Sequence, residues 1–191
     1  MSSTLNETAT NICNEAAADL GDLIHAWTAF QRLVRNESIV DILNRASPHF
    51  FGAVGAALRT YSVILAAKLL EPPVVAGKRT ASLEALLNVS ALDESPCRDL
   101  LRQVKKIRLT AETVIEYRHK RVVHTDYAIR AEKADSRSPS SAEFQDVVHG
   151  LRDFMERFEK AARLQLIPYE NSNGTRDVDE VVRLTASLPS C

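Results

Sequence analysis

The stretch SPCRDLLRQVKKIRLTAETVIEYR, residues 95–118, repeats apolar residues at alternating steps of four and three. This spacing is typical of an amphipathic helix that packs lengthwise against other helices. Ser95 and Pro96 suit the start of that helix, with serine as N-cap and proline at the first helical position. The residues on the predicted buried face are Leu100, Val104, Ile107, Ala111 and Val114.

Three other segments carry the same rhythm. The first runs from about residue 5 to 35 and places Trp27 on its apolar stripe, where we expect it to be a core residue. The second runs from Pro48 to the Pro72-Pro73 pair, which must end it. It is apolar nearly all round, which predicts a central position. The last follows the capping-box pattern Ser140-x-x-Glu143.

Short helices are expected at 38–43, with Ser38 as cap, and at about 81–89. No strand alternation or two-residue hairpin signal is found. The predicted fold is therefore all-α, an antiparallel bundle of four to five long helices with short accessory helices. We expect one helical domain over residues 1–168. Residues 169–191 are expected to form an irregular C-terminal tail with at most a short helix around 178–187.

Composition places the chain among ordinary globular proteins, with 191 residues, 45% apolar and 26% charged. The chain has three cysteines, Cys13, Cys97 and Cys191, which are too few and too scattered for a disulfide framework or a metal cluster. A reducing, cytoplasmic compartment is therefore favoured. No cofactor is expected. No signal peptide is recognised, and the apolar stretch 52–70 is interrupted by Arg59 and Lys68, which favours a core helix over a membrane span.

The net charge of −1 means that any anion binding must depend on a local concentration of bases. One such concentration is EYRHKRVVHTD, residues 116–126. Extending the buried stripe by four residues lands on Arg118, where a guanidinium is costly unless the helix face opens onto a cleft or a partner. The alternative is a solvated basic helix end.

His124 lies six residues beyond Arg118, which is about 120° away around a regular helix. The two side chains can meet on one phosphate if the helix bends or ends between them, or if two copies pair about a two-fold axis. Val122-Val123 is a suitable place for such a deviation. Asp126 could then orient the imidazole.

An arginine beside a histidine suits phosphodiester chemistry. Arginine clamps phosphate oxygens, and histidine moves a proton near neutral pH. Lys105, Lys106 and Arg108 could form an RNA track, or simply a solvated face.

Arg118-x5-His124 resembles the R-x(4-6)-H motif of the HEPN superfamily, which comprises helical-bundle proteins that include many metal-independent ribonucleases. The run YRHKRVVHTD is similar to the R-(N/D)-(K/R)-x-x-A-H-x-D signature of HEPN-like abortive-infection proteins of the AbiU type. Residues 44–87 also resemble the second helix and proline loop of that branch, so the likeness spans roughly residues 10–165. Val123 replaces the usual alanine, and His119 stands where asparagine or aspartate is commoner.

The resemblance implies a metal-independent endoribonuclease of phage defence or of a toxin–antitoxin pair, with RNA as partner and no membrane. Arg118 would bind phosphate and His124 would be the general acid/base, supported by His119 and Asp126. Lys120 and Arg121 would bind RNA. The site would form in a homodimer, and a neutralising antitoxin is a further partner that the family suggests. The alternative is a catalytically inactive, dimeric scaffold of the same fold.

Overall fold

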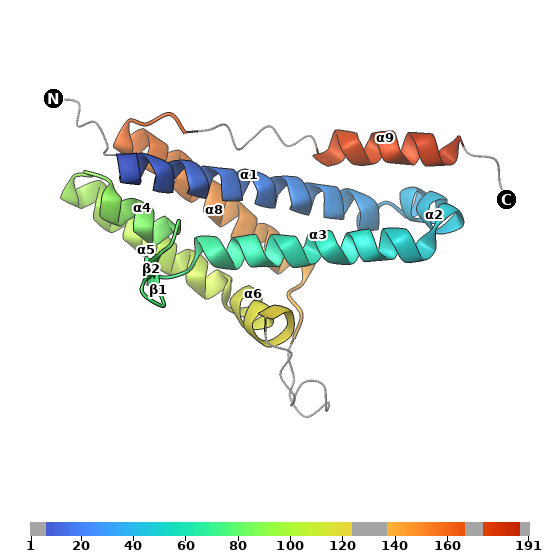
Figure 1. The fold of residues 1–191 in the computed structure, drawn as a ribbon, viewed down its shortest axis with the longest axis horizontal. Coiled ribbons are helices and arrows are strands. Elements are labelled where there is room, and N and C mark those ends of the chain that lie inside the picture. Colours follow the sequence, from blue (N-terminus) through green and yellow to red (C-terminus); the bar gives the residue numbers. More distant parts are fainter. Residues whose placement is uncertain (1–6, 124–136, 167–173, 188–191) are drawn as a thin grey trace.

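The fold is known from a computed structural model, which describes residues 7–123, 137–166 and 174–187 (Figure 1). The described chain is mostly helical with one small hairpin, which confirms the all-α expectation. Its helices are α1 (Glu7–Arg35), α2 (Glu37–Ala46), α3 (Pro48–Leu69), α4 (Leu83–Val89), α5 (Glu94–Thr110), α6 (Glu112–Tyr117), the π-helix η1 (Arg118–Val123), α8 (Ser141–Ala162) and α9 (Gly174–Ala186).

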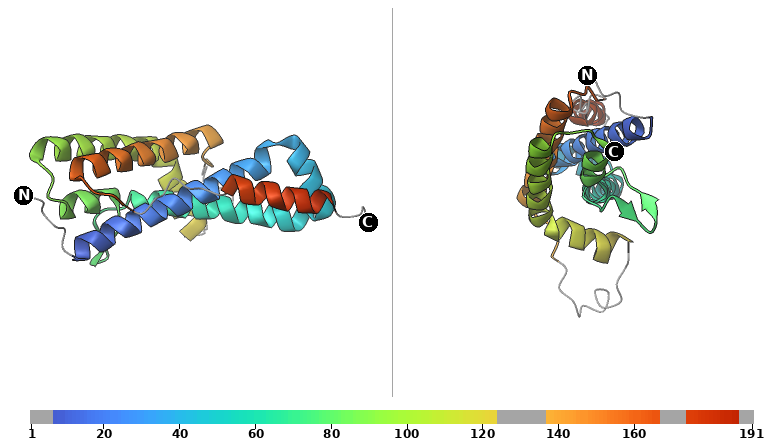
Figure 2. Two further views of the ribbon diagram at one scale, coloured as in Figure 1. Left: turned by 90° about the horizontal axis from the view of Figure 1, so that it is seen from above. Right: turned by 90° about the vertical axis from the view of Figure 1, so that its left-hand side faces the viewer.

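The main core lies where α1, the C-terminal half of α3, α4, α5 and α8 meet (Figures 1 and 2). Trp27 is 4% exposed there and packs against Phe144, with ring centroids 4.4 Å apart, so its assignment to the core is confirmed. The predicted stripe of α5 is buried as well. Gly150 lets α8 approach α5 closely, since a Cβ at this position would lie 3.0 Å from Ile107 Cγ1.

A second, smaller core lies at the other end of α1, between α2, α3 and α9. Val178 of α9 is 7% exposed and packs with Leu33 and Ile39. The expectation was an irregular tail with at most a short helix around 178–187, and the structure instead has a 13-residue helix over Gly174–Ala186. Val178 is buried because the second core receives it, whereas Val181 and Leu184 are 42% and 51% exposed.

Helix caps agree with the sequence in part. Ser140 forms the predicted capping box with Glu143, and α8 starts directly after it. Ser38 does not cap α2. Instead, the Asn36 side chain accepts hydrogen bonds from the backbone N–H groups of Ser38 and Ile39 at 3.1 and 3.3 Å. Asparagine is an equally good cap, and here it lies directly at the corner between α1 and α2.

The helix predicted over residues 95–118 is broken at Ala111. Ala111 and Val114 are both fully buried, so the apolar stripe itself continues as predicted. The axis changes direction after α5, and α6 and η1 then pack against α3 (Figure 1). The contacts of α6 and η1 with α3 therefore decide where the chain after Ala111 lies.

A two-stranded antiparallel hairpin, β1 (Val74–Val75) and β2 (Lys78–Arg79), contradicts the expectation that no hairpin is present. Its two-residue loop has positive φ angles at both Ala76 (49°) and Gly77 (77°). A tight hairpin turn of type I′ requires positive φ at both positions, and alanine is an unusual residue for the first of them. The sequence therefore lacks the usual Asn-Gly signal.

Helix α3 is central only in its C-terminal half. Phe50 in its N-terminal half is 60% exposed, and Tyr61, just past the middle of the helix, is 43% exposed, so the prediction of a central position was wrong for the N-terminal half. By length and composition α3 could also cross a membrane, and a third of its most apolar window is buried. Its charged residues have partners within the protein, because Lys68 pairs with Asp19 at 2.7 Å and Arg59 donates to the carbonyl of Pro139 at 3.0 Å. One such helix is equally compatible with a soluble protein.

Candidate functional site

Arg118 begins the π-helix η1 and points toward the C-terminal end of α3. Its Nη2 atom donates to Glu71 Oε1 at 3.1 Å, and the two side chains are 22% and 23% exposed. The guanidinium on the core stripe is thus compensated by a carboxylate from the turn that follows α3, as its position requires. A solvated helix end, the alternative to a site, does not describe this residue.

One atom of Arg118 stays without a partner. Its Nε is buried and makes no hydrogen bond to any residue that the structure describes. A buried donor left unpaired costs roughly 1–3 kcal/mol. The pairing with Glu71 therefore satisfies the charge of Arg118 but not its full hydrogen-bonding capacity.

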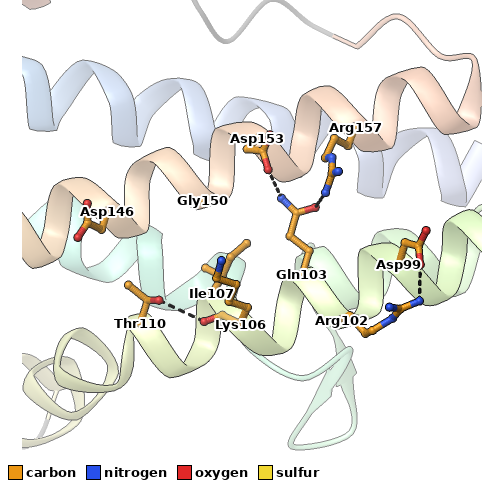
Figure 3. Close-up of a pocket in the computed structure, with 10 residues that line it drawn as sticks. All are labelled: Asp99, Arg102, Gln103, Lys106, Ile107, Thr110, Asp146, Gly150, Asp153 and Arg157. Atoms are coloured by element: carbon orange, nitrogen blue, oxygen red, sulfur yellow. Dashed lines mark hydrogen bonds and ion pairs between the residues drawn. The ribbon is translucent and has the colours of Figure 1, made fainter.

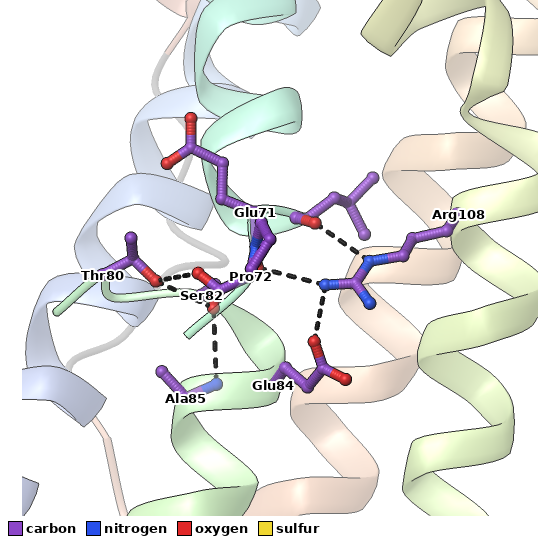
Figure 4. A network of polar contacts seen from close by, with 8 residues as sticks. Glu71, Pro72, Thr80, Ser82, Glu84, Ala85 and Arg108 are labelled. Carbon is purple, nitrogen blue, oxygen red and sulfur yellow. Dashed lines mark hydrogen bonds and ion pairs between the residues drawn. The ribbon is translucent and has the colours of Figure 1, made fainter. Parts of the chain in front are cut away.

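Glu71 is held by a second arginine, on α5 (Figure 4). Arg108 donates to the carbonyl oxygens of Leu70 and Glu71 at 3.0 and 3.1 Å, and to Glu84 Oε2 at 2.8 Å. These carbonyls end α3 and have no partners within the helix, so Arg108 acts as its C-terminal cap. The sequence analysis missed Glu71, although an acid directly before two prolines is fixed in position by the end of the helix.

Arg59 of α3 connects the chain before η1 with the chain before α8. Its guanidinium carbon lies 5.8 Å from the centroid of the Tyr117 ring, and its Nη2 bonds to the Ser138 hydroxyl and to the Pro139 carbonyl. Residues 117 and 138 therefore meet at one point on α3.

The remaining predicted residues are divided between described and undescribed parts of the chain. His119 is exposed, and Lys120 forms an ion pair with Glu116 one turn earlier. Arg121 belongs to η1, but its side chain lies outside the described residues, as do His124 and Asp126. The structure thus places the side chains of Arg118, His119 and Lys120, whereas those of Arg121, His124 and Asp126 lie outside the described residues.

The run of residues 118–123 forms a π-helix and not a regular α-helix. A deviation between Arg118 and His124 was required if the two side chains were to converge. In a π-helix each turn holds more residues, so the 120° offset of a regular helix does not apply to this segment. Short π-helical segments occur frequently at functional sites.

The three bases of α5 do not form one track. Arg108 is occupied by Glu84 and the end of α3, and Lys105 lies with it on one side of α5. Lys106 lies on the other side, along a groove of about 530 Å³ between α5 and α8 (Figure 3). Because these bases lie on two sides of α5, their arrangement favours a solvated helix face over a single RNA track.

Several polar side chains that line the α5–α8 groove bind one another. Gln103 donates to Asp153 at 2.6 Å and accepts from Arg157 at 3.2 Å, while Arg102 pairs with Asp99 (Figure 3). A groove whose polar groups bind one another has little left to offer a ligand.

Cysteine and metal chemistry find little support in the described residues. Cys13 is buried, and burial raises the pKa of its thiol. Cys97 is a partly buried thiol at the edge of the main core. Within residues 7–123, 137–166 and 174–187, no group of three or more His, Cys, Asp or Glu side chains is placed to hold a metal ion.

Comparisons of the chain with models of protein families, with curated proteins and with solved structures gave no match. Function is therefore inferred from the residues themselves.

Proposed function

We propose that this protein is a metal-independent endoribonuclease of the HEPN type, acting in phage defence or as a toxin. The observation that carries the proposal is Arg118. It is a partly buried guanidinium on an apolar stripe, at the first residue of a π-helix. Among the described residues it has one carboxylate partner, and its Nε donor is unused. Such a group is costly to keep in a fold unless it has a use.

The proposed mechanism divides the chemistry between two side chains. Arg118 binds the oxygens of the phosphate at the cleavage point and stabilises the negative charge that develops there. His124 removes the proton of the neighbouring 2′-hydroxyl, whose oxygen attacks phosphorus and expels the 5′-oxygen. The departing 5′-oxygen takes a proton from the solvent, and His124 later releases its own proton to the solvent. The products are a 2′,3′-cyclic phosphate and a 5′-hydroxyl end. His119 and Asp126 support this pair, and Lys120 and Arg121 hold the flanking backbone.

Glu71 adds a step that the sequence alone did not suggest. Its carboxylate occupies the Nη2 of Arg118 at 3.1 Å, so an RNA phosphate must displace it or share the guanidinium with it. Glu71 thereby keeps Arg118 in place without substrate and competes with substrate for it. A homodimer, or a neutralising antitoxin, could shift this competition.

The experiment is RNA cleavage by purified protein in EDTA, comparing the wild type with Arg118→Ala and His124→Ala. Arg98→Ala and His49→Ala are matched controls, since both residues are exposed and lie outside the proposed site. We expect cleavage by the wild type and both controls, and its loss in the two site variants. Equal cleavage by all five proteins, or none by the wild type on several RNAs, would exclude the proposal.

The second candidate is a catalytically inactive, dimeric interaction module of the same fold. The observation that favours it is the exposure of two large aromatic side chains along α3, Phe50 near its start and Tyr61 past its middle. The oligomeric state of wild type and Phe50→Asp, measured by sedimentation, distinguishes the two candidates when it is combined with the result of the cleavage assay. A dimer that Phe50→Asp dissociates, in a protein that cuts no RNA, supports the module.

A further inference from the structure

A hollow of about 360 Å³ lies between the C-terminal half of α1 and the first turns of α8. It continues into a second hollow of about 500 Å³ at the corner between α1 and α2. Gln31, Arg32 and Arg35 line both. The two hollows form one surface next to α9, which packs against the same part of α1 (Figure 2).

Positive charge gathers on this surface. Arg32 and Arg35 come from α1, and Arg152 comes from the middle of α8, with His149 one turn before it. Among the described residues that line the two hollows, Glu37 is the one carboxylate. Arg32 also pairs with Asp179 of α9 at 2.6 Å. Arg32 and Arg35 lie in the last turn of α1, where basic side chains also complement the helix dipole.

Gln31 is the second observation that indicates a ligand. Both Nε2 and Oε1 of its side-chain amide are buried and have no hydrogen-bond partner in the described structure. Buried amides are almost always paired, so an unpaired one next to three guanidinium groups indicates that a partner is missing. An amide offers two donors to an anion and one acceptor to a hydroxyl.

A hydrogen-bonded chain also fixes the histidine of the hollow. Trp27 Nε1 donates to Gln145 Oε1 at 2.7 Å, which orients the amide so that its NH₂ group faces His149 Nε2 at 2.9 Å. In neutral His149 the Nε2 atom then accepts, and the ring proton lies on Nδ1. The imidazole is left with a donor for a ligand.

We infer that this hollow binds a phosphate group, held by Arg35, Arg152 and Arg32 and by the amide of Gln31. Guanidinium groups bind phosphate oxygens in pairs of parallel hydrogen bonds, and a volume of a few hundred Å³ accommodates a nucleotide. The phosphate comes from a free nucleotide or from an RNA backbone. The site is separate from Arg118 and does not depend on ribonuclease activity.

Trp27 makes the inference directly testable, because it lines the hollow and is the one tryptophan of the chain. Its fluorescence is followed while the full-length protein is titrated with inorganic phosphate, uridine monophosphate or a short oligouridylate. We expect a saturable change with each. Similar affinity for the nucleotide and the oligomer identifies a nucleotide site, whereas much tighter binding of the oligomer identifies an RNA backbone site.

Variants separate this site from other basic surfaces. Arg35→Gln should weaken the tightest ligand about tenfold, and Arg98→Gln, also an exposed arginine, should leave it unchanged. Glu37→Gln removes a competing charge and should tighten binding, a gain that misfolding cannot produce. Arg118→Ala should bind as the wild type does, even where it has lost cleavage.

The inference is overturned by any of three results. The first is the absence of a saturable change with all three ligands. The second is equal affinity of Arg35→Gln and Arg98→Gln. The third is loss of binding in Arg118→Ala, which would assign the phosphate to the Arg118 site.

Discussion

Replacing Glu71 by glutamine tests the contact on which the proposed site depends. The substitution keeps the size of the side chain and removes the charge that faces Arg118 at 3.1 Å. At this distance the attraction is about 5 kcal/mol for an effective dielectric constant near 20, before desolvation is subtracted. Breaking a fully buried pair costs about 3–5 kcal/mol, and exposed pairs contribute about 0–1 kcal/mol. Since both partners are about a quarter exposed, we expect a loss of about 1–2 kcal/mol.

The assay has two readouts. Urea unfolding of wild type, Glu71→Gln, Arg118→Gln and the double variant gives the coupling energy of the pair. RNA binding by Glu71→Gln should become several-fold tighter, because the carboxylate no longer competes for Arg118. The control is Glu84→Gln, which breaks the pair with Arg108 at similar exposure and should lower stability without changing RNA binding.

Two results would refute the reasoning. A coupling energy below about 0.3 kcal/mol would mean that Glu71 and Arg118 do not stabilise one another. RNA binding that weakens in Glu71→Gln would mean that the carboxylate positions Arg118 for substrate and does not compete with it.

Three further predictions concern packing and pH. Gly150→Ala should lower the free energy of unfolding by about 1 kcal/mol, because the new methyl group meets an α5 isoleucine at 3.0 Å. A Cβ at Gly52 would meet nothing within 4 Å, so Gly52→Ala should raise the free energy of unfolding by about 0.5–1 kcal/mol. Equal changes in the melting temperatures of the two glycine variants would contradict this prediction. Val178→Asp should detach α9 and increase its hydrogen exchange, whereas Val181→Asp, 42% exposed in the wild type, should not. Burial raises the pKa of Asp19 above 3.8, so the folded state holds this proton more tightly than the unfolded state. The stability of the wild type relative to Asp19→Asn should therefore fall as pH rises from about 4 through the raised pKa, and a pH-independent difference in urea titrations would disprove the assignment.

Local rules were sufficient for much of the helical framework. The four-three stripe of residues 95–118 predicted which side chains of α5 and α6 are buried, and the capping box at Ser140 predicted where α8 starts. Both signals act within one or two turns of a helix. Local rules failed at the start of α2, where Asn36 and Ser38 are equally suitable caps, and at the β-hairpin, whose turn has the unusual residue Ala76.

The candidate site also has one part that the sequence predicted and one part that it did not. The position of Arg118 on a buried stripe is a property of the sequence, since a periodic pattern shows when a charge is out of place. Its partner Glu71 lies 47 residues away, and no local rule connects the two. The phosphate hollow is also non-local, because its arginines come from two helices that are far apart in the chain.

The sequence by itself determined the long helical segments that became α1, α3, α5 and α8, and the buried stripe of α5, because these depend on residue spacing and on caps of a few residues. Only the tertiary structure decided where α5 breaks, that α9 completes a second core and that Glu71 meets Arg118. These features depend on contacts between segments distant in sequence, whose energies become available only once the helices have packed.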